Sequence, residues 1–339
     1  MKPTPLLELT GLRVEYTRPG GRRVRAVRDV DLTISEGETL GLVGESGCGK
    51  SSLGRAVLRA IEPQAGRIDF LGLDITHLKG AQLRAVWADL QMIFQDPFGS
   101  LNPRRKVVDI IAEPMMRARG ATRAQAEERA GDLLELVGLG RDAGHRRPRE
   151  FSGGQRQRIA IARALAPSPK FIVADEPVSA LDVSIQAQVV NLLADLTEES
   201  KLTCLFISHD LGVVRQLADR VAVMYLGQII EIAERDRFFA GPAHPYSAAL
   251  LASVPRVTAT AEPRQAQLQG DPPDPADPPP GCLFSSRCPK VTDRCRTEQP
   301  ALQELEPGRS VRCHFPLNQQ SPLNTIGMET TKEHADIDH

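Results

Sequence analysis

The stretch GESGCGKSS, residues 44–52, has the residue types and spacing of a loop that binds phosphate (a P-loop). Its glycines let backbone N–H groups close around the β-phosphate of a nucleotide, Lys50 can reach the β- and γ-phosphates, and the Ser51 hydroxyl can bind Mg²⁺. The loop follows the apolar run TLGLVG and opens a helical stretch, which is the context that the motif requires. The predicted phosphate-binding residues are Gly44, Glu45, Ser46, Gly47, Cys48, Gly49, Lys50, Ser51 and Ser52.

Polar side chains end three further apolar runs. In FIVADEP, Asp175 can hold Mg²⁺ directly or through water, and Glu176 can orient and deprotonate an attacking water. His209 ends TCLFISH, where it can contact the γ-phosphate, although a lone histidine is more often structural. Gln95 ends LQMIFQ and can reach Mg²⁺ and water while joining the sheet to the helical stretch that follows. These four side chains are therefore predicted to share one site with the P-loop.

A second anion-binding helix start is predicted within FSGGQRQRIAIARAL, residues 151–165. A Ser-Gly-Gly turn opens this helix, and its backbone N–H groups and dipole can grip a phosphate. One chain thus carries two phosphate-gripping helix starts, about a hundred residues apart.

Four of the six cysteines lie near the end of the chain, with the pattern C-x5-C-x6-C-x17-C, at Cys282, Cys288, Cys295 and Cys313. In a reducing compartment this grouping favours metal ligation over disulfides. The spacing fits neither a zinc ribbon nor the common ferredoxin pattern, so a [4Fe–4S] cluster, zinc and no metal all remain open. Cys48 stands alone, and a nucleophilic role for it is disfavoured because the sequence indicates no histidine partner.

The elements that must position these groups follow an α/β pattern. Apolar strand-like runs alternate with helical stretches, which predicts a parallel sheet covered by helices. Two β-like runs precede the P-loop, and a helical block lies between it and FIVAD; in that block Thr122 with Gln125 predicts a capping box, and Gly138 a helix stop.

Composition limits the class of protein. The 339 residues are 41% hydrophobic and 25% charged with a net charge of −1, which indicates a globular chain without a global attraction to nucleic acid. No run of 18 apolar residues and no signal-peptide layout occurs, so a cytoplasmic location is expected, with any membrane association made through a partner.

The order of the motifs resembles that of the ATP-binding-cassette (ABC) ATPases, over about residues 6–254: a P-loop, then SGGQ, then the aspartate–glutamate strand end, SALD and SHD. The resemblance implies a P-loop NTPase ABC ATPase fold with an antiparallel β subdomain, an inserted helical subdomain and a small cysteine-containing C-terminal module. It also implies a role for each motif: Walker A (Gly44 to Ser52), Q-loop (Gln95), signature (Ser152, Gly153, Gly154, Gln155), Walker B (Asp175), catalytic base (Glu176), D-loop (Ser179, Ala180, Leu181, Asp182), switch histidine (His209) and an adenine-stacking aromatic (Tyr16). Phe151 replaces the usual leucine before the signature.

The resemblance and the composition together predict these boundaries: a nucleotide-binding domain at 1–255 with its helical subdomain at about 96–165, a proline-rich linker at 256–281, a C-terminal module at 282–316 and a disordered tail at 317–339. In this family two chains pair head to tail, so that Ser152, Gly153 and Gly154 of one chain grip the γ-phosphate held by Lys50 of the other. A single chain would then hold only half of each ATP site, which explains its two phosphate-gripping helix starts.

Three further segments resemble the ATPases of oligopeptide and dipeptide importers: QDPFGSLNPR, HPYSAALLASVP and PPPGCLFSSRCP. This resemblance implies ATP and Mg²⁺, two membrane permease subunits, a second ATPase that is a sister subunit or another copy, indirect cooperation with a solute-binding protein, and a place at the cytoplasmic face of the inner membrane. Relatives of this subfamily carry a [4Fe–4S] cluster. The alternatives are a nickel or sugar importer and, further off, a soluble ABC ATPase acting on ribosomes or DNA; a small-substrate kinase leaves SGGQ and SALD unexplained.

Overall fold

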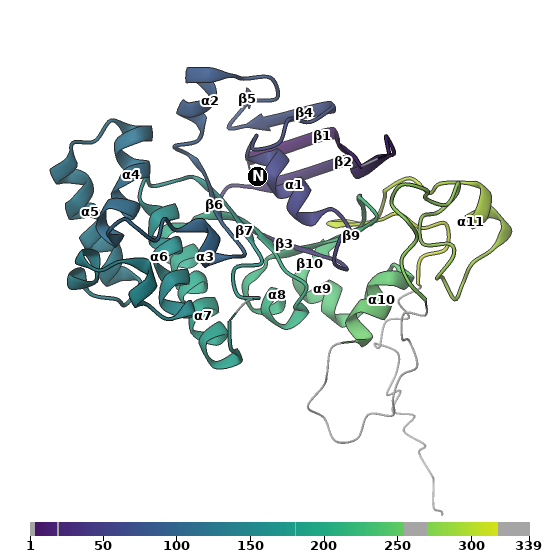
Figure 1. Cartoon of the computed structure of the whole chain (residues 1–339). Coiled ribbons are helices and arrows are strands. Elements are labelled where there is room, and N and C mark those ends of the chain that lie inside the picture. The colour runs from purple at the N-terminus through teal and green to yellow at the C-terminus, as the bar shows by residue number, and fades with distance from the viewer. Residues whose placement is uncertain (1–3, 19, 180, 254–269, 318–339) are drawn as a thin grey trace, which may run out of the picture.

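The computed structural model describes residues 4–18, 20–179, 181–253 and 270–317, which form two β-sheets with helices packed around them (Figure 1). The strands are β1 (Pro5–Thr17), β2 (Arg23–Ser35), β3 (Thr39–Val43), β4 (Ala65–Phe70), β5 (Leu73–Asp74), β6 (Leu90–Ile93), β7 (Phe171–Asp175), β8 (Thr203–Ile207), β9 (Arg220–Tyr225), β10 (Gln228–Glu234), β11 (Gln303–Glu306) and β12 (Arg309–Val311). The helices are α1 (Lys50–Val57), α2 (Gly80–Val86), α3 (Pro97–Ser100), α4 (Val107–Arg119), α5 (Arg123–Leu136), the 3₁₀ helices η1 (Arg141–His145) and η2 (Pro148–Glu150), α6 (Gly153–Leu165), α7 (Val183–Ser200), α8 (Leu211–Leu217), α9 (Arg235–Ala240), α10 (Pro245–Ala252) and α11 (Asp293–Thr297).

The central sheet has eight strands in the order β11-β12-β10-β9-β3-β8-β7-β6. Its strands β9, β3, β8, β7 and β6 pair in parallel, and β3, β7 and β8 are buried along their whole length. Helices cover both faces of such a sheet, which is why these strands are almost continuously apolar in sequence. The predicted α/β fold is therefore confirmed.

A second, antiparallel sheet of order β2-β1-β4-β5 lies above the central one in Figure 1. Exposed and buried residues alternate over much of β1 and β2, as expected of strands with one solvated face. The buried face packs on α1 and the central sheet, and the shared core includes Leu7, Leu9, Ile34, Leu53 and Leu205. The P-loop helix is thus held between the two sheets.

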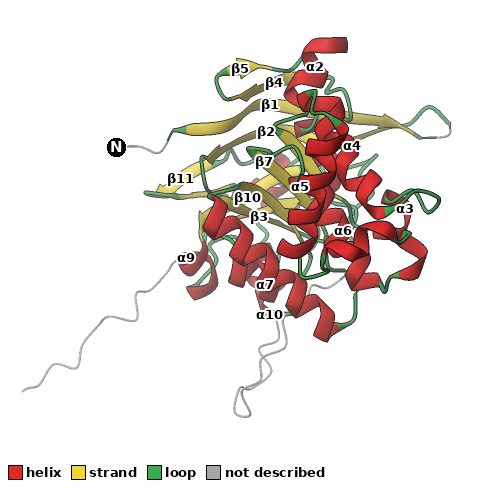
Figure 2. Cartoon of the chain, turned by 90° about the vertical axis from the view of Figure 1, so that its left-hand side faces the viewer, coloured by secondary structure: helices red, strands yellow, loops and turns green. Residues whose placement is uncertain are grey.

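The helical block α3–α6 lies beyond the edge strand β6, at one end of the molecule (Figures 1 and 2). Thr122 and Gln125 form the predicted capping box at the start of α5, and Gly138 follows that helix with a φ of 73°. α6 packs against β6, α4, α5 and α7, so its N-terminus is fixed by several neighbours.

The C-terminal segment is continuous with the central sheet, because β12 pairs with β10 and β11 pairs with β12. Arg309 of β12 donates to Glu231 of β10 at 2.8 Å, and both side chains are fully buried. The Glu231 carboxylate also accepts the backbone N–H groups of Ala243 and His244, so the buried charge is well hydrogen-bonded. Residues 256–269 of the predicted linker and residues 318–339 of the predicted tail lie outside the described ranges.

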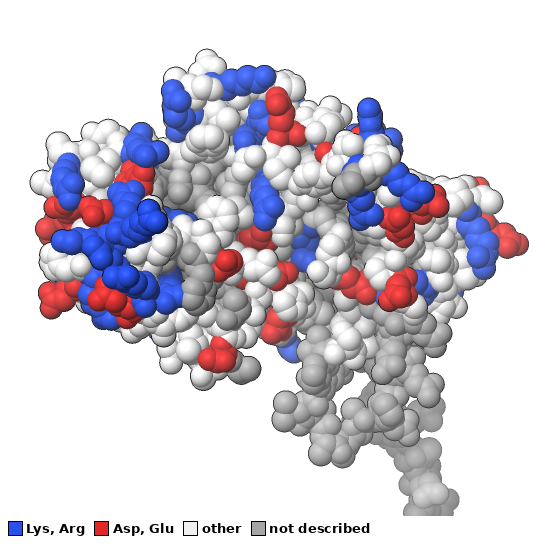
Figure 3. Space-filling view, in the orientation of Figure 1, with Lys and Arg blue, Asp and Glu red and all other residues white. Residues whose placement is uncertain are grey.

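Acidic and basic side chains are interspersed on the face shown in Figure 3, in keeping with the net charge of −1. Within the part of the chain that the structure describes, no helix is both long and apolar enough to cross a bilayer.

Candidate functional site

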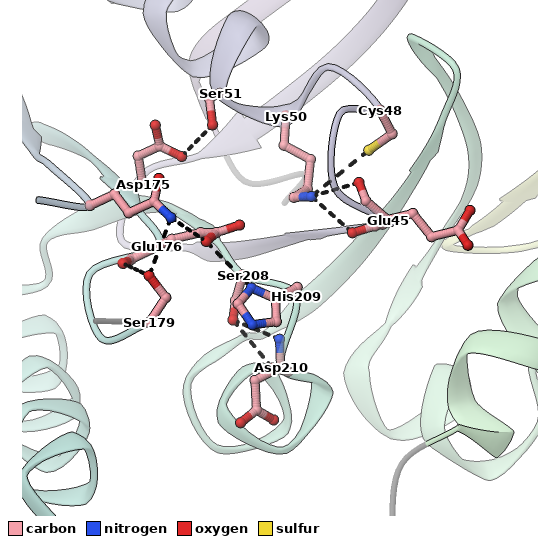
Figure 4. Close-up of polar contacts among 12 residues, drawn as sticks. Glu45, Cys48, Lys50, Ser51, Asp175, Glu176, Ser179, Ser208, His209 and Asp210 are labelled. Carbon is pink, nitrogen blue, oxygen red and sulfur yellow. Dashed lines mark hydrogen bonds and ion pairs between the residues drawn. The ribbon is translucent and has the colours of Figure 1, made fainter. Parts of the chain in front are cut away.

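The predicted chemical groups converge at the carboxyl edge of the central sheet. The P-loop follows β3, Asp175 ends β7, His209 follows β8, and Gln95 follows β6. Since β3 pairs with β8, β8 with β7 and β7 with β6, these four ends lie in succession along one edge. Sequence positions more than a hundred residues apart thereby form one site (Figure 4).

Two P-loop glycines are required by close backbone contacts. At Gly44, with φ of 154°, a Cβ would lie 2.2 Å from the Met224 carbonyl oxygen; at Gly49, with φ of 110°, it would lie 2.0 Å from the Ala26 carbonyl oxygen. The Lys50 ammonium donates to the carbonyl oxygens of Gly44 and Glu45 at 2.8 and 3.0 Å. The loop is thus tightly wound around the lysine side chain.

Two of the three predicted Mg²⁺ ligands, Ser51 and Asp175, contact each other, whereas the third, Gln95, contacts Glu176. The Ser51 hydroxyl donates to the Asp175 carboxylate at 2.8 Å, and Asp175 is only 2% exposed. Burial raises the pKa of Asp175, and the Ser51 hydrogen bond opposes that rise. A carboxylate and a hydroxyl beside a phosphate-binding loop fit Mg²⁺, which usually takes one or two carboxylates together with substrate phosphates and water.

Glu176 is the point on which Gln95 and His209 converge. The Gln95 amide donates to Glu176 Oε2 at 2.8 Å, and His209 Nδ1 lies 3.4 Å from the same oxygen. The Glu176 backbone has φ of 47°, an uncommon conformation for a non-glycine residue, and its N–H donates to the Ile207 carbonyl at 3.0 Å. The end of β7 therefore fixes the backbone of Glu176, and the Glu176 carboxylate lies where the ends of β6, β7 and β8 come together (Figure 4).

A cleft of about 380 Å³ contains most of these groups. It is lined by Ser46 to Ser52, Gln95, Glu176 and Tyr16, whose hydroxyl donates to Ser52 Oγ at 3.2 Å. It is also lined by residues that the sequence reasoning missed: Arg18, Val24, Arg25, Ala26, Leu226, Gly227 and Pro275. Arg18 lies in the β1–β2 connection, Val24 to Ala26 lie at the start of β2, Leu226 and Gly227 form the β9–β10 connection, and Pro275 lies in the C-terminal segment. No local motif marks these residues.

The predicted signature residues do not line this cleft. Ser152 caps α6 by accepting from the Gln155 backbone N–H, and the Gln155 side chain accepts from the Ser152 N–H in return. Gly154 packs against α7, where a Cβ would lie 2.2 Å from Cγ2 of Ile185. The second helix start is therefore well formed but stands apart from the first.

Among the predicted D-loop residues, the Ser179 hydroxyl donates to the Glu176 carbonyl oxygen at 3.1 Å. Asp182 is the residue before α7, and Leu181 lies near Gly153. Ala180 lies outside the described residues.

The four C-terminal cysteines line one small cavity together with Phe284 and His314. Burial raises the pKa of Cys282 and Cys288, and raises that of Cys313 to about 11. In the described part of the chain, however, no three His, Cys, Asp or Glu side chains are close enough to hold a metal ion. The structure therefore brings the thiols to one place without arranging them as a coordination shell.

Cys48 is buried, and burial raises its pKa, so its thiol is kept in the unreactive neutral form.

A P-loop with strand-end carboxylates at the edge of a parallel sheet, together with a separate SGGQ helix start, defines a cassette-type P-loop ATPase. A family model described as "ABC transporter" matches residues 27–179, and one described as "Oligopeptide/dipeptide transporter, C-terminal region" matches residues 230–295. The chain belongs to the ABC transporter ATP-binding proteins, an ATPase family.

Relatives and solved structures agree with this assignment. The chain is 49% identical to the putative oligopeptide transport ATP-binding protein YkfD of Bacillus subtilis, over 95% of this chain and 98% of that protein. It is 50% identical to the oligopeptide transport ATP-binding protein AppF of the same organism, over 86% and 90%. The fold matches the dimeric ATP-binding cassette MJ0796 bound to ADP and Pi, with a TM-score of 0.62 and 29% identity over 68% of this chain and 98% of that one.

Proposed function

We propose that this chain is the ATP-hydrolysing subunit of a membrane importer for oligopeptides or dipeptides. The observation that carries the peptide class is the C-terminal region at residues 230–295, which matches the model of the oligopeptide/dipeptide transporters. Relatives that are about 50% identical to this chain over 86–95% of its length carry peptide transport in their names. The protein would lie peripherally at the cytoplasmic face of the inner membrane.

The P-loop would cradle the β- and γ-phosphates of ATP, and Tyr16, whose hydroxyl contacts Ser52, would stack on the adenine. Ser51, Gln95 and Asp175 would hold Mg²⁺, which neutralises phosphate charge when bound. Since Asp175 is buried at the end of β7, its carboxylate is fixed before the nucleotide arrives, and binding requires little rearrangement of this side chain.

Glu176 would act as the general base that accepts a proton from the attacking water. The amide of Gln95 and the ring of His209 both lie at Glu176 Oε2, so they would position the water and sense the γ-phosphate next to the base. These two distances to one carboxylate oxygen support the proposed roles.

The signature residues Ser152 to Gln155 would complete the ATP site of a second ATPase. This proposal is supported by their separation from the cleft of their own chain and by the place of Gly153 and Gly154 in the first turn of α6, since a helix N-terminus favours an anion. In a head-to-tail dimer each ATP would lie between Lys50 of one chain and the signature of the other. ATP would then hold the two chains together, and hydrolysis would release them.

A groove of about 540 Å³ between the central sheet and the helical block would receive a cytoplasmic segment of one permease subunit. Its lining includes Trp87 and Phe94, which are 38% and 41% exposed, and α4 closes its other side with Ile110 and Pro114. Large apolar side chains exposed in a groove are typical of a protein interface. Movement of the helical block on ATP binding would reach the permease at this point.

The importer proposal is tested by uptake of a labelled peptide into cells or vesicles that contain this chain with the membrane subunits that co-purify with it. Peptide uptake that stops on Glu176→Gln is expected. Uptake of nickel or a sugar instead would support the alternative importers. Turnover stimulated by ribosomes or DNA, without membrane subunits, would contradict the importer proposal altogether.

We also propose that Cys282, Cys288, Cys295 and Cys313 bind a [4Fe–4S] cluster with a structural role. The proposal is supported by their convergence on one cavity, although their present spacing is not that of ligands and closure around the cluster would be needed. Between residues 282 and 313 the buried apolar side chains are limited to Leu283, Phe284, Cys295 and Val311, so a cluster would add stability to this packing. Zinc and no metal are the alternatives.

The cluster proposal predicts that Cys288→Ala removes a broad brown absorbance and bound iron from anaerobically purified protein. The control is Cys204→Ala, because Cys204 lies in β8, far from the cavity in the fold. Absorbance and iron content are measured on the same preparation. Colourless wild type that contains zinc, or contains no metal, would contradict the cluster.

A further inference from the structure

The first variable residue of the P-loop, Glu45, is held by two side chains from the C-terminal third of the protein. Its backbone N–H donates to the Tyr246 hydroxyl at 2.9 Å. Its carboxylate accepts two parallel hydrogen bonds from the Arg287 guanidinium, at 2.7 and 2.9 Å. Tyr246 belongs to the His-Pro-Tyr sequence at the start of α10, and Arg287 lies beside Cys288. None of the motif roles above uses these contacts.

The two side chains are anchored rather than mobile. The ring of Tyr246 packs against Tyr225 of β9 and Phe284 of the cysteine-bearing segment, with ring centroids 4.7 and 5.4 Å apart. His244 accepts the Tyr246 backbone N–H at 3.0 Å, and burial lowers the pKa of His244 to about 3, which keeps the ring neutral and able to accept. The Arg287 side chain is only 4% exposed. A contact between rigid partners transmits position well.

Glu45 matters for the nucleotide in two ways. Its carbonyl oxygen accepts from the Lys50 ammonium at 3.0 Å, so the place of Glu45 sets the place of the lysine. Its carboxylate is a negative charge within the loop that binds a polyphosphate, and an unpaired carboxylate there would oppose the phosphates. Arg287 neutralises this charge through a bidentate ion pair, which also fixes the orientation of the Glu45 carboxylate.

A second set of contacts joins the C-terminal segment to the lining of the cleft. Pro275 lines the cleft, and its carbonyl oxygen accepts from Arg28 of β2 at 2.8 Å. Next to it, Asp274 pairs with Arg18, which also lines the cleft, at 3.2 Å. The C-terminal region therefore contacts both the P-loop, at Glu45, and the lining of the cleft, at Arg18 and through Pro275.

We propose that Tyr246 and Arg287 are positioning residues for nucleotide binding, through which the C-terminal region holds the P-loop in its binding conformation and neutralises Glu45. Arg287 neutralises the Glu45 carboxylate and fixes its orientation, and Tyr246 holds the Glu45 backbone N–H. Loss of either contact lowers the fraction of chains whose P-loop is ready to bind, and the apparent affinity falls by the same factor.

The test measures the Kd of fluorescent mant-ADP with Mg²⁺ for single and double variants. Arg287→Gln leaves the Glu45 carboxylate unpaired and is expected to raise the Kd about tenfold. Glu45→Gln in the same chain removes that charge, so the double variant Glu45→Gln/Arg287→Gln is expected to regain most of the lost affinity. Tyr246→Phe keeps the packed ring, removes only the hydroxyl and is expected to raise the Kd about threefold.

The matched control is Arg294→Gln, which breaks the exposed Arg294–Glu298 pair of the same C-terminal segment and is expected to leave the Kd unchanged. Unaltered affinity in Arg287→Gln, or a double variant no better than the single one, would overturn the coupling. Melting curves recorded without nucleotide distinguish a loss of stability from a loss of nucleotide affinity. A variant that melts at a lower temperature but keeps the wild-type Kd would also overturn the coupling. The proposal rests on the proposed function, in which the P-loop is the nucleotide site. If the wild-type chain did not bind mant-ADP, it is that assignment of the P-loop that would be wrong.

Discussion

Replacing Glu176 by glutamine is expected to slow ATP turnover by about a thousandfold and to leave the protein as a stable ATP-bound dimer. The substitution keeps the size and direction of the side chain that meets Gln95 and His209, but the amide cannot accept a proton from water. Since ATP would join the two chains and only hydrolysis would separate them, the dimer should persist. Phosphate release measures turnover, and gel filtration with ATP and Mg²⁺ measures assembly.

The control for this variant is Glu199→Gln on the exposed side of α7, which carries the same change of charge away from the site. It should turn over ATP like the wild type. A Glu176→Gln chain that stayed monomeric with ATP and Mg²⁺ would show that the catalytic-base assignment or the dimer is wrong. Near-normal turnover in that variant would point to a different base.

The second large effect is expected from a pair of inactive chains that restore each other. Gly153→Asp is suited to this test, because a Cβ at Gly153 would meet only Leu181, at an ordinary 3.5 Å, and the Ser152 cap is retained. An aspartate in the first turn even favours the helix, yet its charge would repel a phosphate at the helix start. The chain should therefore fold normally and lose activity. Lys50→Ala removes the lysine of the other half-site.

Each variant alone is expected to be inactive, whereas an equimolar mixture should regain about a quarter of wild-type turnover, since half of the dimers are mixed and each has one intact site of two. ATP hydrolysis by the mixture is measured against each variant at the same total concentration. No recovery in a mixture shown to dimerise would contradict sites shared between chains. Full activity of Gly153→Asp by itself would remove the signature from the ATP site.

Gly154 illustrates how the structure refines such a design. By sequence Gly153 and Gly154 are equivalent members of the SGGQ motif. In the fold a side chain at Gly154 would meet Ile185 of α7 at 2.2 Å, so a substitution there would disturb packing as well as phosphate contact. Of the two glycines, Gly153 is the one at which a substitution changes the contact with phosphate without disturbing packing.

The sequence by itself determined the α/β class and which side chains meet at the sheet edge. P-loop spacing is local, and Asp175, Glu176 and His209 each follow an apolar run, so the rule that parallel strands end at one edge was enough to bring them together. The capping box at Thr122 was equally predictable, because both partners lie within one helical turn.

Only the tertiary structure decided what lies around those groups. Tyr246 and Arg287 reach Glu45 from 201 and 242 residues away, Pro275 forms a cleft wall, and β11 and β12 extend the central sheet. Such contacts depend on how the buried faces of distant elements pack, and no short-range spacing encodes that packing. The residues of each motif can therefore be recognised from local sequence, whereas the residues that hold a motif in place are known only from the complete fold.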